Sequence, residues 1–228
     1  MSESRLVIAI DGPSGGGKST LTRLLAERLG YLPIDTGAMY RTLALAISRS
    51  GISPDDEGGV EQLCRKVEIR FLRDDGSYRV IADGEDVSQA IRTPEISMLT
   101  SRISAQRGVR EILLKLQREL GKEGGVILEG RDIGTVVFPH AQVKFFLSAT
   151  PRERGERRFL ELLEKGSDAT LEETIAAVIQ RDEQDAAREL APLRKAADAV
   201  EIDSTGVTIE EVLSRMEQVV RERAKSFE

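Results

Sequence analysis

The sequence has one cysteine, one histidine and no asparagine among its 228 residues. Cys64 has no partner for a disulfide within the chain, which excludes a disulfide-stabilised scaffold and favours a reducing compartment. A single histidine, His140, excludes a zinc site built from several cysteine and histidine ligands. Any histidine-based catalysis would depend on this one side chain.

Long hydrophobic runs are also missing. The first apolar run, from Leu6 to Ile10, is too short for the hydrophobic region of a secretory signal and ends at Asp11. No run approaches the roughly 20 apolar residues that cross a bilayer. We therefore expect a cytoplasmic protein that does not associate with membranes.

Basic residues are outnumbered, with 33 Lys and Arg against 39 Asp and Glu and a net charge of -6. Proteins that hold nucleic acid through its phosphates normally carry a basic excess, so we expect no nucleic-acid partner. Hydrophobic residues make up 40% of the chain, which is enough to bury an ordinary core and excludes a mostly disordered protein.

Short apolar runs alternate with stretches of helical periodicity, which predicts an α/β fold with a parallel sheet covered by helices on both faces. Five runs are the expected strands: 6–10, 31–34, 126–128, 143–147 and 199–202. Helical spacing follows the first run and recurs around 109–120, 152–164, 171–188 and 209–225. The expected architecture is a three-layer α/β/α unit over residues 1–228 with a central five-stranded parallel sheet.

One segment departs from this alternation of strands and helices, and its pattern predicts an antiparallel hairpin. Residues 67–73 and 78–82 flank an Asp-Asp-Gly-Ser turn, and Asp-Gly between alternating runs is a strong hairpin signal. A second acidic turn follows at 83–86. We interpret residues from about 36 to 105 as an inserted subdomain with a small antiparallel sheet, attached to a core of residues 1–35 and 106–228.

Residues 12–19 read G-P-S-G-G-G-K-S and match the phosphate-binding pattern G-x-x-x-x-G-K-[ST] in full. Glycines let successive backbone N–H groups point at phosphate oxygens, and a helix beginning at about Lys18 adds partial positive charge. Lys18 would reach the β- and γ-phosphates, while the Ser19 hydroxyl can coordinate Mg²⁺. We expect ATP to be bound by Gly12, Pro13, Ser14, Gly15, Gly16, Gly17, Lys18, Ser19 and Thr20.

The absence of asparagine narrows the class of phosphate-loop protein. A switch GTPase normally reads guanine with an Asn-Lys-x-Asp motif, and a protein kinase needs an asparagine in its catalytic loop. Motor and helicase ATPases usually have a larger body. A small kinase, or a binder that hydrolyses ATP, remains.

Candidate acceptor groups follow two of the predicted strands. Thr36 and Arg41 come after the second strand, and Arg131 comes after the third. The carboxyl ends of parallel strands are where open α/β sheets bind ligands, and a hydroxyl with guanidinium groups suits an anion. Thr36 could equally be a helix N-cap, and the two roles can coexist.

Two arginine clusters have both a functional and a purely structural interpretation. Arg181, Asp185 and Arg188 lie at i, i+4 and i+7 of a predicted helix, which is also the pattern of a solvated ion-pair ladder. Four arginines fall within residues 152–158 and could simply line a surface helix. Assembling like charges beside a phosphate loop in an acidic protein favours an anion between them.

A phosphate acceptor would explain why no general base is evident. A phosphomonoester with a second pKa near 6 is largely ionised at neutral pH, so no proton must be removed before attack. Catalysis then consists of positioning and of neutralising charge across an in-line transition state.

The chain resembles the bacterial cytidylate kinases, a family of P-loop nucleoside monophosphate kinases. The resemblance extends from Val7 to about Thr205 and depends on several blocks together, because the phosphate loop alone is shared by many families. These blocks are I-D-G-P-S-G-G-G-K-S (10–19), D-T-G-A-M-Y-R (35–41), D-G-E-D-V-S (83–88) with I-R-T (91–93), G-R-D-I-G-T-V-V-F-P (130–139), R-D-E-Q-D-A-A-R (181–188), and A-D-A (197–199) with D-S-T (203–205) near the end.

The resemblance implies transfer of a phosphoryl group from ATP to CMP or dCMP, with Mg²⁺, in a protein that we expect to be a monomer. Residues about 36–105 would be the CMP-binding subdomain, and a helical lid at about 150–168 would close over the transferring group. The implied catalytic residues are Lys18, Arg131, Arg157, Arg158 and Arg188. The implied CMP contacts are Ser101, Arg110 and Asp132 to the base, Arg181 and Asp185 to the sugar, and Thr36, Arg41, Arg131 and Arg188 to the phosphate.

One departure from the family pattern and two alternatives remain open. Position 36 is Thr where relatives often carry Ser, so an extra methyl group lies near the predicted acceptor phosphate or sugar. A kinase of the same fold could act on UMP or on a non-nucleotide phosphate acceptor. A non-catalytic nucleotide sensor would bind ATP without CMP-dependent turnover, although it would need only one phosphate cradle.

Overall fold

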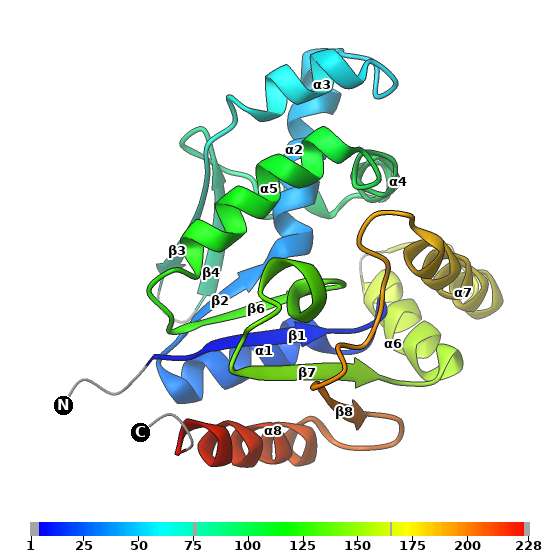
Figure 1. The fold of residues 1–228 in the computed structure, drawn as a ribbon. Helices are drawn as coiled ribbons and strands as arrows, with labels where there is room; N and C mark the ends of the chain where they lie inside the picture. The colour runs from blue at the N-terminus through cyan, green and yellow to red at the C-terminus, as the bar shows by residue number, and fades with distance from the viewer. Residues whose placement is uncertain (1–4, 75–76, 165, 226–228) are drawn as a thin grey trace. The chain divides into compact units, whose positions relative to one another are not determined.

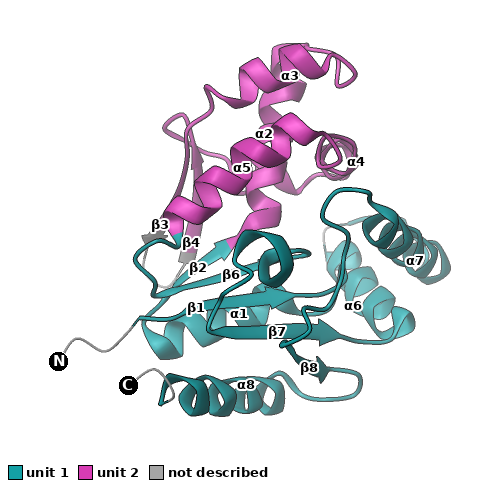
Figure 2. Cartoon of the chain, in the orientation of Figure 1, with its two compact units in different colours: residues 1–34, 121–228 teal, residues 35–120 magenta. Residues whose placement is uncertain are grey.

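The computed structural model describes residues 5–74, 77–164 and 166–225. The chain divides into two compact units, the first of residues 1–34 and 121–228 and the second of residues 35–120 (Figure 2). The second unit extends beyond the boundary near residue 105 that we expected from the sequence, because it also contains the helix α5 (Arg107–Leu120).

The first unit is built on a parallel sheet with the strand order β2-β6-β1-β7-β8 (Figure 1). The central strand β1 pairs with β6 on one side and β7 on the other, so that Ile8 lies opposite both Ile127 and Val143. All five predicted strands are confirmed to within two residues at their ends: β1 (Val7–Asp11), β2 (Leu32–Asp35), β6 (Val126–Gly130), β7 (Val143–Ser148) and β8 (Val200–Asp203).

Two helices cover one face of this sheet, α1 (Lys18–Leu29) and α8 (Ile209–Ala224) (Figure 1). Ile8 and Ile10 point into this layer and pack with Leu25 and Leu213, all fully buried. Because side chains alternate along a strand, the residues on either side of Ile8 and Ile10 point to the opposite face of the sheet. There a single π-helical turn, η2 (Ile133–Val137), follows β6 and lies over β1.

The remaining helices of the first unit, α6 (Pro151–Glu164) and α7 (Leu171–Ala187), pack against each other. Gly155 makes their close approach possible, because a Cβ atom added there would lie 2.4 Å from Cγ1 of Ile175. A capping box between Thr170 and Glu173 begins α7. No helix in the described ranges has the length and apolarity to cross a membrane.

The described residues of the second unit form four α-helices, a short 3-10 helix and a three-stranded antiparallel sheet, in the order β3-β4-β5. The predicted hairpin is confirmed as β3 (Ile69–Asp74) and β4 (Ser77–Ala82), although its turn residues Asp75 and Gly76 lie outside the described residues. The acidic stretch expected to be only a turn contributes the strand β5 (Glu85–Asp86). The other elements are α2 (Thr36–Ser50), α3 (Glu57–Cys64), η1 (Ala90–Arg92) and α4 (Pro94–Ile103).

Candidate functional site

The glycine-rich loop follows β1 at the carboxyl end of the sheet, and α1 begins at Lys18 as predicted. Gly12 has φ +150°, and a Cβ atom there would lie 2.1 Å from the carbonyl oxygen of Leu147. Gly17 has φ +81° and is the N-cap of α1. Only glycine fits both positions without strain, so these residue types are required by the curl of the loop itself.

Lys18 is buried beneath this loop, with 6% of its surface exposed. Its ammonium group donates a hydrogen bond of 2.6 Å to the carbonyl oxygen of Pro13. Burial, followed by the positive charge of Arg131, lowers the pKa of Lys18 below its ordinary value. The loop therefore contains a cation that is poorly compensated by its own surroundings and suited to an anionic ligand.

Glu129 is a functional candidate that the sequence reasoning missed. It lies on β6, is 5% exposed, and accepts a hydrogen bond of 3.0 Å from the Ser19 hydroxyl. Oxygen donors of this kind are the ligands that Mg²⁺ prefers, and Mg²⁺ in such sites relies on few protein ligands plus phosphate oxygens. Among the described residues no group of three or more His, Cys, Asp or Glu side chains could hold a metal alone.

Asp11 links the strand before the loop to the turn after β6. Its carboxylate accepts hydrogen bonds from the backbone N–H groups of Ile133 (2.8 Å) and Gly134 (2.7 Å). Burial raises the pKa of Asp11 to about 6, despite these two hydrogen bonds. The contact fixes the segment that begins with Arg131 and Asp132, and Asp132 is itself 8% exposed.

Asp185 lies buried between two of the predicted phosphate-binding arginines. Its carboxylate pairs with Arg131 at 2.7 Å and with Arg188 at 2.6 Å, and the Asp185 side chain is 2% exposed. Burial alone would raise its pKa, but the two arginines outweigh burial and the pKa lies below its ordinary value. The interpretation of this row as a solvated ladder is therefore wrong for Asp185.

The geometry of the row also differs from the expected single helical face. Helix α7 ends at Ala187, and Arg188 is the C-cap with extended backbone (ψ 133°). Arg188 consequently reaches Asp185 from beyond the helix end. Arg181 lies within electrostatic range of both Lys18 and Asp185, so the structure brings this predicted residue to the loop.

The four arginines of α6 have different surroundings, because residues two apart lie on opposite sides of a helix. Arg152 and Arg158 form surface pairs with acidic neighbours on their own helix, as the structural interpretation predicted. Arg157 donates hydrogen bonds to Oγ (3.1 Å) and to the carbonyl oxygen (2.8 Å) of Ser204. Its Nη1 lies 3.9 Å from the Cβ position of Gly17, at the edge of the loop.

Arg154 is the buried member of this cluster, with 3% exposure. Its guanidinium group donates to the carbonyl oxygens of Ala149 (2.9 Å) and Ser14 (3.0 Å), and it pairs with Asp182 of α7 at 2.6 Å. Ser14 belongs to the glycine-rich loop, so Arg154 joins the loop to both α6 and α7. The sequence gives no sign that this arginine differs from its three neighbours.

In the second unit, Thr36 is the first residue of α2 and not its N-cap. Asp35 is the cap: its carboxylate accepts from the N–H of Ala38 at 2.8 Å and pairs with Arg41 at 2.7 Å. Burial opposes ionisation of Asp35, but Arg41 and Arg92 keep its pKa below the ordinary value. The Nε of Arg41 is buried and has no hydrogen-bond partner among the described residues.

Ser101 and Arg110 come together through Ser104. The Ser104 hydroxyl donates to the carbonyl oxygen of Ser101, and the Ser104 carbonyl accepts from Arg110 at 3.1 Å. Arg110 also lies over the ring of Tyr40, 5.8 Å from its centroid. The second unit therefore groups the predicted base contacts Ser101 and Arg110, while the predicted contacts in the first unit are Arg131, Asp132, Arg181, Asp185 and Arg188.

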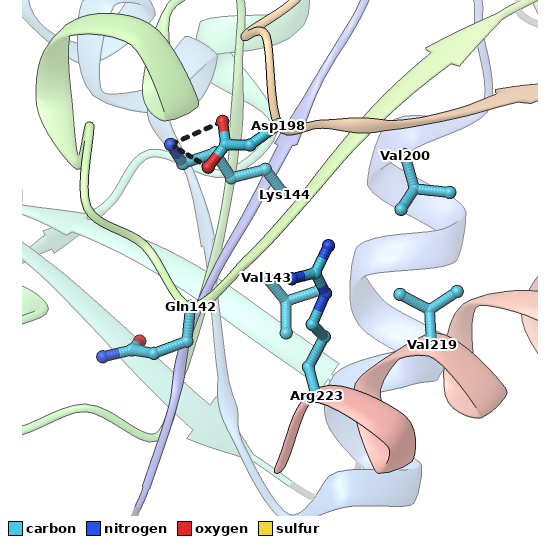
Figure 3. A pocket seen from close by; sticks show the side chains of 7 residues that line it. All are labelled: Gln142, Val143, Lys144, Asp198, Val200, Val219 and Arg223. Carbon is cyan, nitrogen blue, oxygen red and sulfur yellow. Dashed lines mark hydrogen bonds and ion pairs between the residues drawn. The ribbon is translucent and has the colours of Figure 1, made fainter. Parts of the chain in front are cut away.

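A small pocket that is partly open to solvent lies at the amino ends of β7 and β8 (Figure 3). Lys144 and Asp198 pair within it at 2.8 Å, and Lys144 also donates to the carbonyl oxygen of Pro139. The hydrogen bond from Lys144 is the main cause that lowers the pKa of Asp198. The contact with Pro139 fixes the end of the segment that follows β6, and Asp11 fixes the beginning of the same segment.

Comparisons with known proteins agree with the resemblance found in the sequence. A family model described as Cytidylate kinase matches residues 8–222. A cytidylate kinase of Geobacter sulfurreducens is 66% identical over 221 residues, 97% of this chain and 95% of the relative. One from Citrifermentans bemidjiense is 63% identical with the same coverage. A gluconokinase structure from Sinorhizobium meliloti, 14% identical, has a TM-score of 0.51 over 99% of this chain and 97% of its own, which shows a shared fold alone.

Proposed function

This chain belongs to the cytidylate kinase family, and from that premise we propose that it transfers the γ-phosphoryl group of ATP to CMP or dCMP, giving ADP and CDP or dCDP. One observation carries the proposal furthest. Strands β1 and β6 are neighbours with Asp11 opposite Gly130, so the donor loop and Arg131 follow adjacent strand ends, and the positive charge of Arg131 contributes to the lowered pKa of Lys18. Two nucleotides bound on either side of this pair would bring their phosphates together.

On the donor side, residues 12–20 bind ATP, and Lys18 moves from the Pro13 carbonyl to the phosphates. Its lowered pKa supports this assignment, because an anion would relieve the repulsion from Arg131. Mg²⁺ would be held by Ser19, with Glu129 beside it. When bound, the ion would neutralise charge on the transferring phosphoryl group.

On the acceptor side, Arg131, Arg188, Arg41 and Thr36 hold the phosphate, and Arg181 and Asp185 contact the sugar. Asp185 already fixes both Arg131 and Arg188 with charged hydrogen bonds, so the two guanidinium groups are positioned in advance. Planar guanidinium groups bind phosphate oxygens in pairs, which suits an acceptor that carries two negative charges.

The cytosine base is assigned to Ser101 and Arg110 in the second unit and to Asp132 in the first. Asp132 is positioned by the hydrogen bond that Asp11 accepts from the next residue in the chain. Arg110 is positioned by its hydrogen bond to Ser104 and by the ring of Tyr40. A carboxylate can accept from the exocyclic amino group of cytosine, whereas uracil presents a carbonyl there. This difference favours CMP over UMP.

No side chain needs to act as a base, because the attacking phosphate oxygen is already ionised. The residues therefore position the reactants and neutralise charge, with Lys18, Arg131, Arg157, Arg158 and Arg188 in the catalytic set. Helix α6 and the residues after it, to about 168, would form the lid that excludes water and limits hydrolysis of ATP. Arg157 lies next to Gly17 and Arg158 is on the exposed side of the helix, where only closure would bring it to the phosphates.

We also propose that the reaction takes place in the cytoplasm and that one chain is sufficient for it. The single cysteine favours a reducing compartment, and each residue assigned above belongs to this chain. Sedimentation of the purified protein tests the second statement. A monomer that has full activity is the expected result.

Coupled ADP release with CMP, dCMP, UMP and AMP as acceptors tests the reaction. We expect CMP and dCMP to be strongly preferred, and equal turnover of AMP would contradict the base assignment. Lys18→Ala should lower kcat by about 100-fold or more. Lys195→Ala, which removes an exposed lysine paired with Glu201, is the matched control and should leave kcat unchanged. ATP binding without any CMP-dependent turnover would indicate a nucleotide sensor instead.

A further inference from the structure

Arg154 is the least exposed arginine of α6 and is not needed by any step proposed above. Three acceptors surround its guanidinium group: the carbonyl oxygens of Ala149 and Ser14, and the carboxylate of Asp182. It also packs directly under the loop, because a Cβ atom on Gly15 would lie 3.1 Å from Cβ and from the carbonyl oxygen of Arg154. Any shift of the loop backbone at residues 14–15 must therefore displace Arg154.

Asp182, the acidic partner of Arg154, lies on α7. It follows Arg181 directly and precedes Asp185 by one helical turn, so it lies on the helix that carries the proposed sugar contacts. Its Oδ2 pairs with Arg154, whereas its Oδ1 is buried and has no partner within the described ranges. Arg154 is thus the contact that compensates this carboxylate, and loss of the pair would leave a poorly solvated charge.

Helices α6 and α7 also pack closely beside this pair. Gly155 lies against Ile175, where even one added carbon would overlap the side chain. A displacement of Arg154 would then be passed to α7 through Asp182 and through this packing. At the end of α7, Asp185 holds Arg131 and Arg188, so the displacement reaches the proposed acceptor site.

We propose that the Arg154–Asp182 pair positions α7 relative to the glycine-rich loop and thereby couples the donor and acceptor sites. This inference rests on the proposed function, since it requires that both nucleotides bind. Binding of ATP at the loop would then increase the affinity for CMP, and linkage requires that CMP increase the affinity for ATP by the same factor. Both residues are positioning residues, because neither is assigned a contact with substrate.

Isothermal titration calorimetry can measure this coupling directly. The dissociation constant of CMP is measured with and without a saturating non-hydrolysable ATP analogue and Mg²⁺, and the reverse titration checks reciprocity. We expect the wild type to show at least about fivefold tighter binding of the second nucleotide. In Asp182→Asn and in Arg154→Lys this ratio should fall towards one. Glu156→Gln, which neutralises the partner of the exposed Arg152 on the same helix, should keep the wild-type ratio.

Thermal melting of each variant separates coupling from simple stabilisation. If the variants melt at a lower temperature but keep the wild-type ratio within about twofold, the pair is only structural and the inference is overturned. A wild-type ratio of one overturns it as well. If Arg154→Lys does not fold, Asp182→Asn decides, because it leaves the hydrogen bonds from Arg154 to Ser14 and Ala149 in place. Absence of CDP formation by the wild type would instead contradict the proposed function, and that assay is independent of the calorimetry.

Discussion

Asp11→Asn removes a carboxyl group whose ionisation is opposed by its surroundings. The side chain is 3% exposed and accepts from the N–H groups of Ile133 and Gly134. The asparagine side chain has one oxygen acceptor and an NH2 group in place of the two carboxylate oxygens. The variant therefore loses one of these two hydrogen bonds wherever the wild-type carboxyl is ionised. The pH dependence of stability, in contrast, isolates the ionisation itself.

The direction and size of that dependence follow from the pKa. A value of about 6 in the folded protein, in place of the ordinary 3.8, corresponds to about 3 kcal/mol, since each pH unit is worth about 1.4 kcal/mol. Between these two values the folded protein binds more protons at Asp11 than the unfolded chain does. The free energy of unfolding therefore falls as the pH rises, and the stabilising contribution of the protonated group, complete below pH 3.8, is lost by about pH 6.

Urea unfolding of the wild type and the variant from about pH 4 to about pH 7.5 measures this contribution as a difference between the two proteins. We expect the wild type to lose up to about 3 kcal/mol relative to Asp11→Asn across this range. Asp198→Asn is the control: Lys144 lowers the pKa of Asp198 below its ordinary value of 3.8, so the contribution of this carboxylate is nearly complete above pH 4 and the difference between wild type and Asp198→Asn should stay nearly constant across this range. A difference between wild type and Asp11→Asn that does not change with pH, or that favours the wild type at higher pH, would refute the reasoning.

Three further changes test other parts of the site. Arg188→Ala should raise the KM for CMP by about 10- to 100-fold with little change in the KM for ATP, and unchanged CMP kinetics in the coupled assay would contradict its role. Glu129→Gln should raise the Mg²⁺ concentration needed for half-maximal rate, measured by Mg²⁺ titration; an unaltered requirement would exclude it from the metal site. Gly155→Ala should lower the melting temperature, because overpacking against Ile175 costs about 1–3 kcal/mol, whereas Gly58→Ala, where the nearest atom to an added Cβ is 3.7 Å away, should not.

The parts of the site that could be predicted from the sequence are those whose signal is contiguous. The phosphate loop occupies eight successive residues, and the helix after it begins at the predicted Lys18. The inner strands β1 and β6 are buried along their whole length and begin with apolar runs, and the ends of all five strands were predicted to within two residues. The hairpin was predictable for the same reason, since its turn and both strands adjoin in sequence.

The residues that were missed act through contacts between distant segments. Glu129 meets Ser19 across 110 positions, and Arg154 meets Ser14 across 140. No local pattern distinguishes these side chains from other charged residues that follow a strand or line a helix. Their roles depend on which strands are neighbours, and the order β2-β6-β1-β7-β8 cannot be deduced from the apolar runs alone.

Helix ends were the other source of error, because neighbouring residues compete for the same role. Asp35 and Thr36 are both suitable N-caps, and the carboxylate takes the position since it also pairs with Arg41. The spacing of Arg181, Asp185 and Arg188 suggested one continuous helix, yet the chain leaves helical geometry at Arg188. Arg188 therefore turns back and pairs with the buried Asp185. A ladder of surface ion pairs would instead be exposed to solvent.

The net charge of the chain does not reveal that several cations lie around the phosphate loop, and their presence there has a mechanistic meaning. The chain carries a net charge of -6, yet the charged groups that act on the buried Lys18 include Arg131 and Arg181 beside Glu129 and Asp11. Cations held together in a low-dielectric site repel one another strongly, and an anionic ligand converts that repulsion into attraction. The acidic surface, which is exposed to water and screened by salt, opposes this local attraction only weakly. The net charge of the chain therefore does not describe the preference of the site, which is decided by the charged groups around Lys18.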